Sequence, residues 1–203
     1  MKIIEQNRAP NPRRVRIFLA EKGVTVPFEQ IDIMKKEHRA AGYSALNPLQ
    51  QVPTLVLDDG TAIGESVAIC RYFEELHPAP PLMGTTPLER ATIEMWQRRV
   101  ELAVLLPISH CFRHTHPAMA ELEVPQVAAW GEVNRARVAD VLRLIDGELA
   151  RRPFIAGPRY SIADITALVA LDFMKPARIE RPAGLAALER WHGEVSSRPS
   201  AKA

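Results

Sequence analysis

Cysteine, long apolar runs and an excess of charge of one sign are all scarce in this chain of 203 residues. The two cysteines, Cys70 and Cys111, form neither a disulfide framework nor a CxxC motif, which excludes a small disulfide-stapled secreted protein. No apolar run reaches the roughly 18 residues of a membrane span, and no signal-peptide-like apolar segment follows Met1. A net charge of +2 is too small for a nucleic-acid binder. We therefore expect a soluble, reduced, cytoplasmic protein that binds neither a membrane nor nucleic acid.

The composition that remains is that of a globular protein, with 47% hydrophobic and 25% charged residues. Two patterns divide the chain. Residues 1–77 alternate strand-like and helical segments, whereas residues 86–203 are helical in pattern throughout. Between them, residues 78–85 are rich in proline and cannot continue a helix, so they are interpreted as a linker between two domains.

The first domain is predicted to follow the order βαβαββα. Asp58-Asp59-Gly60 separates two short apolar runs and is typical of a hairpin turn, and Gly23 is well placed to end the first helix. The expected strands are residues 2–6, 28–33, 54–57 and 61–63, and the expected helices are residues 13–22, 35–46 and 65–76.

The second domain is predicted to be entirely helical. Thr86 to Glu89 has capping-box spacing with proline at the first helical position, and Pro107 is expected to kink or end the helix that starts there. Further helices are expected over residues 126–149 and 184–195. Another begins at the capping-box pair Ser161 and Asp164.

Several stretches of this sequence closely resemble cytosolic glutathione transferases, in order and at the expected spacing. Asn47-Pro48-Leu49-Gln50-Gln51-Val52-Pro53-Thr54-Leu55, Asp58-Asp59-Gly60 and Gly64-Glu65-Ser66-Val67-Ala68-Ile69 resemble the glutathione-binding half. The first helix of bacterial members is similar to residues 10–23. The core of their helical domain is similar to residues 152–157 and 161–164, and their usual ending to residues 198–200. The resemblance is to bacterial members of theta, zeta and nu type. It implies a thioredoxin-like N-terminal domain with a mixed four-stranded sheet, an all-α C-terminal domain, glutathione as co-substrate, a role in detoxification, and a homodimer.

Glu65 and Ser66 are candidate ligands for one end of glutathione. They lie between a short strand and an apolar helical run, where free backbone N–H groups and a hydroxyl suit a carboxylate and a glutamate suits an ammonium group. The resemblance assigns these positions to the γ-glutamyl end. The alternative is a Ser/Glu helix cap without a ligand, which is a common feature of proteins.

Val52, Pro53, His38 and Gln51 are candidates for the remainder of glutathione. By resemblance, Val52-Pro53 is a cis-proline turn that exposes the Val52 backbone to the cysteinyl unit, as an added strand would pair. An ordinary trans bond is the alternative. His38, in a basic cluster, would meet the glycyl carboxylate by resemblance, with Gln51 beside it. A solvated basic turn is the alternative there.

The position that activates the thiol departs from the resembled family, whose members place a Tyr, Ser or Cys after the first strand. The serine position of theta-like and zeta-like members falls on Ala9, and residues 1–24 contain no Tyr, Ser, Thr or Cys. Asn11, followed by Pro12, is interpreted as a helix N-cap whose amide could donate to a thiolate. Asn11 could instead be a cap only, and Arg8 and Arg13 are further candidates.

The sequence predicts no metal site. His110, Cys111, His114 and His116 are clustered, and His110 and His114 have helical i, i+4 spacing, but no acidic fourth ligand lies close in the sequence. These side chains could instead face the acceptor pocket. The function predicted is a glutathione-dependent transferase that activates the thiol for attack on an electrophilic, peroxide or disulfide substrate. Two alternatives stay open: a glutathione-dependent disulfide reductase or peroxidase, and a non-catalytic binding protein with the same fold.

Overall fold

A computed structural model describes all 203 residues, which form two compact units. Residues 1–81 with 202–203 make the first unit, and residues 82–201 make the second. The exact domain limits predicted from the sequence, with a linker over 78–85, stay a prediction. None of the helices combines the length and the apolar composition that a membrane crossing requires.

The first unit is built on the predicted mixed four-stranded sheet, in the order β2-β1-β3-β4. β1 runs parallel to β2 and antiparallel to β3, and β3 and β4 form an antiparallel hairpin. Its strands are β1 (Lys2–Glu5), β2 (Phe28–Gln30), β3 (Thr54–Val56) and β4 (Ala62–Ile63), and its helices are α1 (Pro10–Lys22), α2 (Ala41–Leu46) and α3 (Ser66–Leu76). This is the thioredoxin-like arrangement expected from the sequence.

Three of the expected elements differ from the structure by three residues or more. Strand β2 ends at Gln30, three residues before the expected end. Helix α1 begins at Pro10, three residues before the expected start, because proline is tolerated in a first helical turn, where backbone N–H groups have no intrahelical partner. The helix expected over residues 35–46 is divided at Ala40, whose backbone is extended, into a 3-10 turn (Glu37–Arg39) and α2. Gly23 ends α1 in the left-handed conformation, as predicted.

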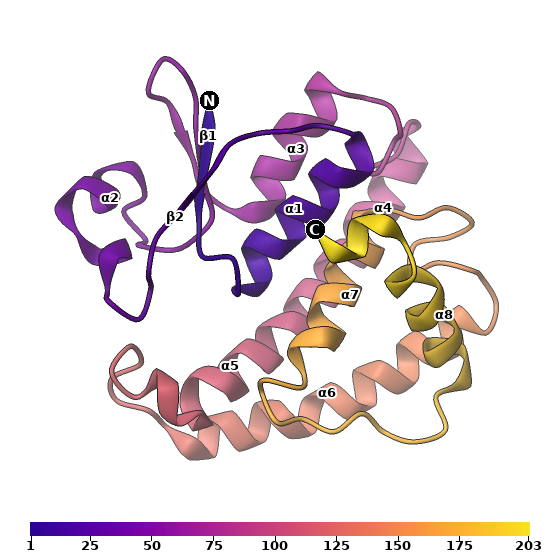
Figure 1. Ribbon diagram of the computed structural model, residues 1–203. Helices are drawn as coiled ribbons and strands as arrows, with labels where there is room; N and C mark the ends of the chain where they lie inside the picture. The colour runs from indigo at the N-terminus through magenta and orange to yellow at the C-terminus, as the bar shows by residue number, and fades with distance from the viewer. The chain divides into compact units, whose positions relative to one another are not determined.

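Helices α1 and α3 lie side by side on one face of the sheet, and α2 lies on the other side (Figure 1). The face of α1 toward α3 carries Arg14, Phe18 and Lys22, which share one side of the helix because they are four residues apart. Arg14 and Phe18 are fully buried, and the side chain of Lys22 is also buried. Two cationic side chains are therefore buried in this packing layer, which the apolar pattern of the helix does not predict.

The second unit contains only helices, as predicted. They are α4 (Pro87–Val100), a π-helical turn η2 (Glu101–Leu105), α5 (Leu106–Thr115), α6 (Ala128–Leu149), α7 (Ile162–Phe173) and α8 (Ala186–Ser196), with 3-10 turns at Pro117–Met119 and Pro199–Lys202. The backbone stays helical from α4 through η2 into α5. Pro107 lies in the first turn of α5, directly after the π turn. A π turn is a common irregularity inside a helix, and here it separates α4 from α5 where the sequence predicts a kink or an end.

Helix α4 begins at Pro87 with Thr86 as its N-cap, whose hydroxyl accepts the Glu89 N–H at 3.2 Å. The Glu89 carboxylate does not accept the Thr86 backbone N–H, which a capping box would require. It accepts from the N–H and the hydroxyl of Thr85 instead, and it pairs with Arg159. These bonds to Thr85 and Arg159 lower the pKa of Glu89 to about 2.

The capping box at Ser161 and Asp164 is confirmed. The fully buried Asp164 carboxylate accepts from the backbone N–H groups of Ile155 and Ser161 at 2.8 and 2.9 Å, and from the indole N–H of Trp191 at 2.8 Å. Burial raises the pKa of Asp164 to about 6, and these hydrogen bonds act in the opposite direction. One carboxylate thus connects the start of α7, the segment before it and α8.

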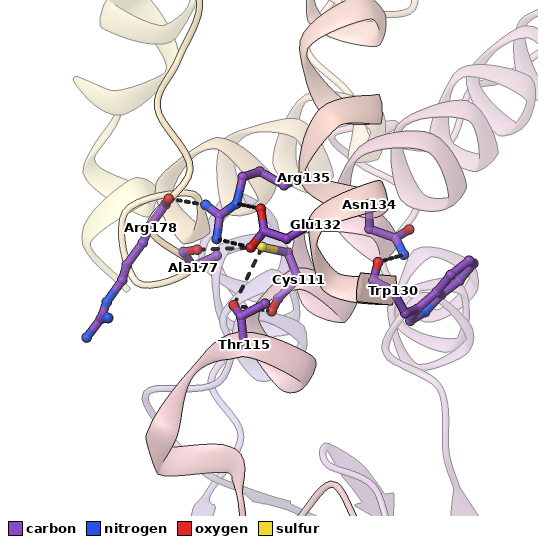
Figure 2. A network of polar contacts seen from close by, with 8 residues as sticks. All are labelled: Cys111, Thr115, Trp130, Glu132, Asn134, Arg135, Ala177 and Arg178. Carbon is purple, nitrogen blue, oxygen red and sulfur yellow. Dashed lines mark hydrogen bonds and ion pairs between the residues drawn. The ribbon is translucent and has the colours of Figure 1, made fainter. Parts of the chain in front are cut away.

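The packing of α5 against α6 requires Gly131. A Cβ atom at this position would lie 2.4 Å from Thr115 Cγ2, so with any larger residue the Thr115 side chain or the helix backbone would have to shift. Figure 2 shows the contacts on either side of this crossing. Cys111 Sγ donates to the Ala177 carbonyl at 3.8 Å, and Arg135 donates to the Arg178 carbonyl. Buried Cys111 is therefore a packing residue of the helical core.

Candidate active site

The sheet register brings the predicted site residues to one edge of the first unit. Ile4 near the end of β1 pairs with Thr54 at the start of β3, and Leu55 pairs with Ile63 at the end of β4. The segments that follow β1 and β4 and the segment that precedes β3 therefore leave the sheet at the same edge. The segment after β2 also leaves there, because β2 runs parallel to β1. These four segments contain Asn11, His38, Gln51, Val52, Pro53, Glu65 and Ser66.

The start of α3 has the strongest anion-binding character in this group. Glu65 is the N-cap residue, with an exposed side chain and a positive φ of 58°, and Ser66 is the first helical residue and only 5% exposed. The Ser66 hydroxyl accepts a hydrogen bond from Arg14 Nη1 at 2.8 Å. Free backbone N–H groups and the helix dipole add positive potential at this point. Sequence inspection missed Arg14, because an arginine in an amphipathic helix is normally exposed.

The turn before β3 is held by side chains of α2 and of the residue that follows it. Asn47 Nδ2 donates to the Gln51 carbonyl at 2.9 Å and to Thr54 Oγ1 at 3.1 Å. The Tyr43 hydroxyl donates to the same carbonyl at 2.5 Å, and burial raises the pKa of Tyr43. The peptide bond between Val52 and Pro53 is cis, as the resemblance implied. Sequence inspection assigned no role to Tyr43.

His38 differs from the rest of its basic cluster. It is 7% exposed in the 3-10 turn after β2, whereas Lys35, Lys36 and Arg39 are exposed. A solvated basic turn therefore describes those three residues and not His38. The neighbouring candidate Gln51 has an exposed side chain.

Asn11 is not the N-cap of α1, and this prediction is wrong. The N-cap residue is Ala9, with extended backbone, and Pro10, Asn11 and Pro12 occupy the first turn. The sequence favoured Asn11 as cap because proline at the first helical position is common, but both prolines fit in this turn. Since prolines carry no N–H and Arg13 N–H donates to the Ala9 carbonyl, Asn11 supplies the first turn's free backbone donor. Its half-buried amide adds a second potential donor.

Comparison with known proteins decides the family. A family model described as the glutathione S-transferase N-terminal domain matches residues 9–76, and a model of the C-terminal domain matches residues 125–194. Glutathione S-transferase 2 of Saccharomyces cerevisiae is 38% identical over 205 residues, covering 100% of this chain and 88% of that protein. The chain belongs to the glutathione S-transferase family.

Solved structures place this glutathione S-transferase in the Gtt2-like class. The crystal structure of Gtt2 from Saccharomyces cerevisiae superposes with a TM-score of 0.95 at 38% identity, covering 100% of this chain and 99% of that one. A glutathione S-transferase domain-containing protein from Marinobacter aquaeolei has a TM-score of 0.96 at 39% identity, covering 98% and 99%. The activity of the protein is thus glutathione S-transferase activity in the general sense, with glutathione as the co-substrate that the family implies.

The rings of His110 and His114 lie 6.3 Å apart in an edge-to-face arrangement, but the histidines of the second unit each have other contacts. His110 lies with its ring 5.8 Å from that of Trp130, and burial lowers the pKa of His110. His114 accepts the Val127 N–H at 3.2 Å, and its Nε2 lies 3.8 Å from a carboxylate oxygen of Glu123, an acidic neighbour that sequence inspection missed. His116 Nδ1 accepts from the Ala118 N–H. No three His, Cys, Asp or Glu residues are grouped as metal ligands.

Proposed function

We propose that the edge of the sheet described above binds glutathione in an extended conformation. Ser66, the N–H groups at the start of α3 and the Glu65 carboxylate hold the γ-glutamyl carboxylate and ammonium group. The backbone of Val52 pairs with the cysteinyl unit beside Pro53, and His38 with Gln51 meets the glycyl carboxylate. The observation that carries this proposal is the buried Ser66 hydroxyl at a helix start that shares one sheet edge with the other segments.

Asn11 and the start of α1 favour the thiolate of the bound glutathione. A thiolate needs hydrogen-bond donors, and because residues 1–24 contain no hydroxyl or thiol side chain, other groups must supply them. The Asn11 amide and backbone N–H supply two donors in a helical first turn, whose dipole also favours an anion. The thiolate then attacks an electrophilic carbon, forming a carbon–sulfur bond while the leaving group departs with the bonding electron pair.

A side-by-side assay tests this reaction class. The protein is incubated with glutathione and either a chloronitrobenzene or a mixed disulfide of glutathione. Faster release of chloride than of the disulfide's thiol supports conjugation as the main reaction. Rapid disulfide exchange with negligible chloride release would assign the protein to the reductases instead.

Replacement of Ser66 with alanine is expected to weaken glutathione binding by about 1.5 kcal/mol, or about tenfold in Kd, because a hydrogen bond to a charged carboxylate is lost. Isothermal calorimetry measures the effect. The matched control is Ser197→Ala, which removes an exposed hydroxyl bonded to the Glu194 carbonyl at the end of α8. Equal Kd values for Ser66→Ala and Ser197→Ala would remove Ser66 from the site.

Replacement of Asn11 with aspartate is expected to lower turnover about tenfold or more while leaving stability nearly unchanged, because a carboxylate accepts rather than donates and repels a thiolate. The side chain of Asn11 caps no helix, so neither Asn11→Asp nor Asn11→Ala loses a cap hydrogen bond. The measurements are kcat, the pKa of bound glutathione from its thiolate absorbance, and the thermal midpoint. Wild-type turnover in both variants would exclude Asn11 from thiolate stabilisation.

The proposal includes a homodimer, which the family resemblance implies. Leu88, Met95 and Leu102 are seven residues apart along α4 and η2 and are 78%, 40% and 49% exposed. Seven residues are close to two helical turns, so the three apolar side chains form one stripe. A solvent-exposed stripe of this kind is typical of a surface that a second copy of the chain covers.

Replacement of both Met95 and Leu102 with glutamate is expected to convert the dimer to a monomer, because each charge would have to be buried in an apolar interface. Light scattering at micromolar concentration measures the mass. Val124→Glu, at a position 78% exposed and outside the stripe, is the control and should leave the mass unchanged. A monomer mass for the wild-type protein would contradict the homodimer itself.

A further inference from the structure

We infer that Arg14 is a positioning residue of the glutathione site, which orients and polarises the Ser66 hydroxyl toward the ligand carboxylate. The inference rests on the proposed function of Ser66 and adds a residue of α1 that the ligand does not touch. Arg14 is 0% exposed, and its Nη1 lies 2.8 Å from Ser66 Oγ.

The direction of this hydrogen bond determines what the hydroxyl does. A guanidinium group has donors only, so Ser66 Oγ accepts from Arg14 and keeps its own O–H to donate. A hydroxyl that accepts from a cation is a stronger donor to an anion, because hydrogen bonds in series polarise one another. Ser66 is therefore held as a donor directed at the negative charge that a helix start attracts.

The charge of Arg14 also acts on the buried face of α3. Cys70, one turn after Ser66 on α3, is fully buried, and burial raises its pKa to about 12 while the charge of Arg14 acts to lower it. The guanidinium charge therefore reaches the buried face of α3, where the charge of Glu74 acts on Cys70 in the opposite direction. The contact with the Ser66 hydroxyl is the route by which Arg14 acts on the ligand, and because Arg14 and Ser66 are both buried, solvent and salt screen this contact weakly.

The packing of α1 against α3 holds Arg14 in place. Arg14 and Lys22 are eight residues apart on α1, and their partners Ser66 and Glu74 are eight residues apart on α3, so each pair spans about 12 Å of helix. The two helices therefore run in the same direction with matched contacts at both ends. A shift of one helix along the other would remove the guanidinium from Ser66.

A double-mutant cycle on Arg14 and Ser66 tests the inference. Arg14→Gln alone should raise the Kd for glutathione about tenfold, and it should raise the KM for glutathione without changing kcat at saturation. In the Ser66→Ala background, Arg14→Gln should change Kd less than about twofold, because the hydroxyl through which it acts is absent. Equal effects of Arg14→Gln in the two backgrounds would overturn the inference.

Arg16→Gln is the control for loss of a partly buried, ion-paired arginine from α1, since the Arg16 side chain is 16% exposed. Arg16 pairs with Glu5 at 2.6 Å, so its replacement lowers stability without touching α3. Its Kd for glutathione should equal the wild-type value. A Kd that rises as much in Arg16→Gln as in Arg14→Gln would show that both act only through stability.

A second measurement does not depend on ligand binding. The thiol introduced by Ser66→Cys should ionise at least one pH unit lower with Arg14 present than in the Arg14→Gln background, since a guanidinium in contact favours the thiolate and the helix start is common to both proteins. Thiolate absorbance against pH, with the titration of the matching protein without Ser66→Cys subtracted, gives each midpoint. Equal midpoints in the two backgrounds would overturn the inference. If wild-type protein failed to bind glutathione, the proposed function would fall, whereas this titration would still report on Arg14.

Discussion

Replacement of Asp164 with alanine is expected to lower the free energy of unfolding by about 4 kcal/mol, because four buried donors, the Ser161 hydroxyl among them, lose their acceptor at once. The indole of Trp191 and the N–H groups of Ile155 and Ser161 all point at this carboxylate. For a chain of this size we expect the thermal midpoint to fall by roughly 12 °C, as measured by calorimetry.

The control for this prediction is Asp140→Ala. Asp140 forms an exposed i, i+3 pair with Arg143, and its side chain is 85% exposed. Its removal should change stability by less than about 0.5 kcal/mol. If Asp164→Ala were as mild as Asp140→Ala, the carboxylate would not be the connection between α7 and α8 that the hydrogen bonds indicate.

Replacement of Lys22 with methionine is expected to destabilise the first unit by about 3–5 kcal/mol, because Glu74 is left as a buried charge without its cation. Lys22 Nζ lies 2.5 Å from the Glu74 carboxylate and also donates to the His77 and Pro80 carbonyls. The side chains of Lys22 and Glu74 are 0% and 8% exposed. Denaturant unfolding, followed by fluorescence, measures the loss.

Two further variants separate the ion pair from general packing. Lys22→Met combined with Glu74→Leu should recover a substantial part of the lost stability, because no uncompensated charge is then buried. Lys2→Met breaks an exposed pair with Glu29 of similar length, 2.6 Å, and should cost at most about 1 kcal/mol. Additive effects of the two replacements at Lys22 and Glu74 would show that the pair itself contributes nothing.

Because Lys22 and Arg14 lie on one face of α1, loss of the Lys22 contact also bears on the glutathione site. We expect Lys22→Met to weaken glutathione binding only in proportion to unfolding, since its contact lies at the opposite end of the α1–α3 interface from Ser66. This behaviour distinguishes a residue that stabilises the interface from one that acts on the ligand through a hydroxyl.

Several features were determined by local sequence alone. The hairpin turn at Asp58-Asp59-Gly60, the left-handed end of α1 at Gly23 and the capping box at Ser161 and Asp164 all depend on residues within four positions of one another. Their geometry is set by backbone conformations and side-chain bonds that neighbouring residues decide. The ordered set of glutathione transferase motifs was likewise visible in the sequence, and the family comparison confirmed it.

Tertiary structure decided the roles of charged and polar residues. Nothing near Arg14 in the sequence indicates that it is buried, because its partner Ser66 is 52 residues away and an isolated helix would leave arginine in water. Asn11 also has the local pattern of a cap, yet the chain after β1 enters α1 early enough to make Ala9 the cap and Asn11 part of the first turn. The burial of a side chain and the alignment of two helices depend on which elements pack together. The buried cations Arg14 and Lys22 between α1 and α3 therefore arise only in the folded chain.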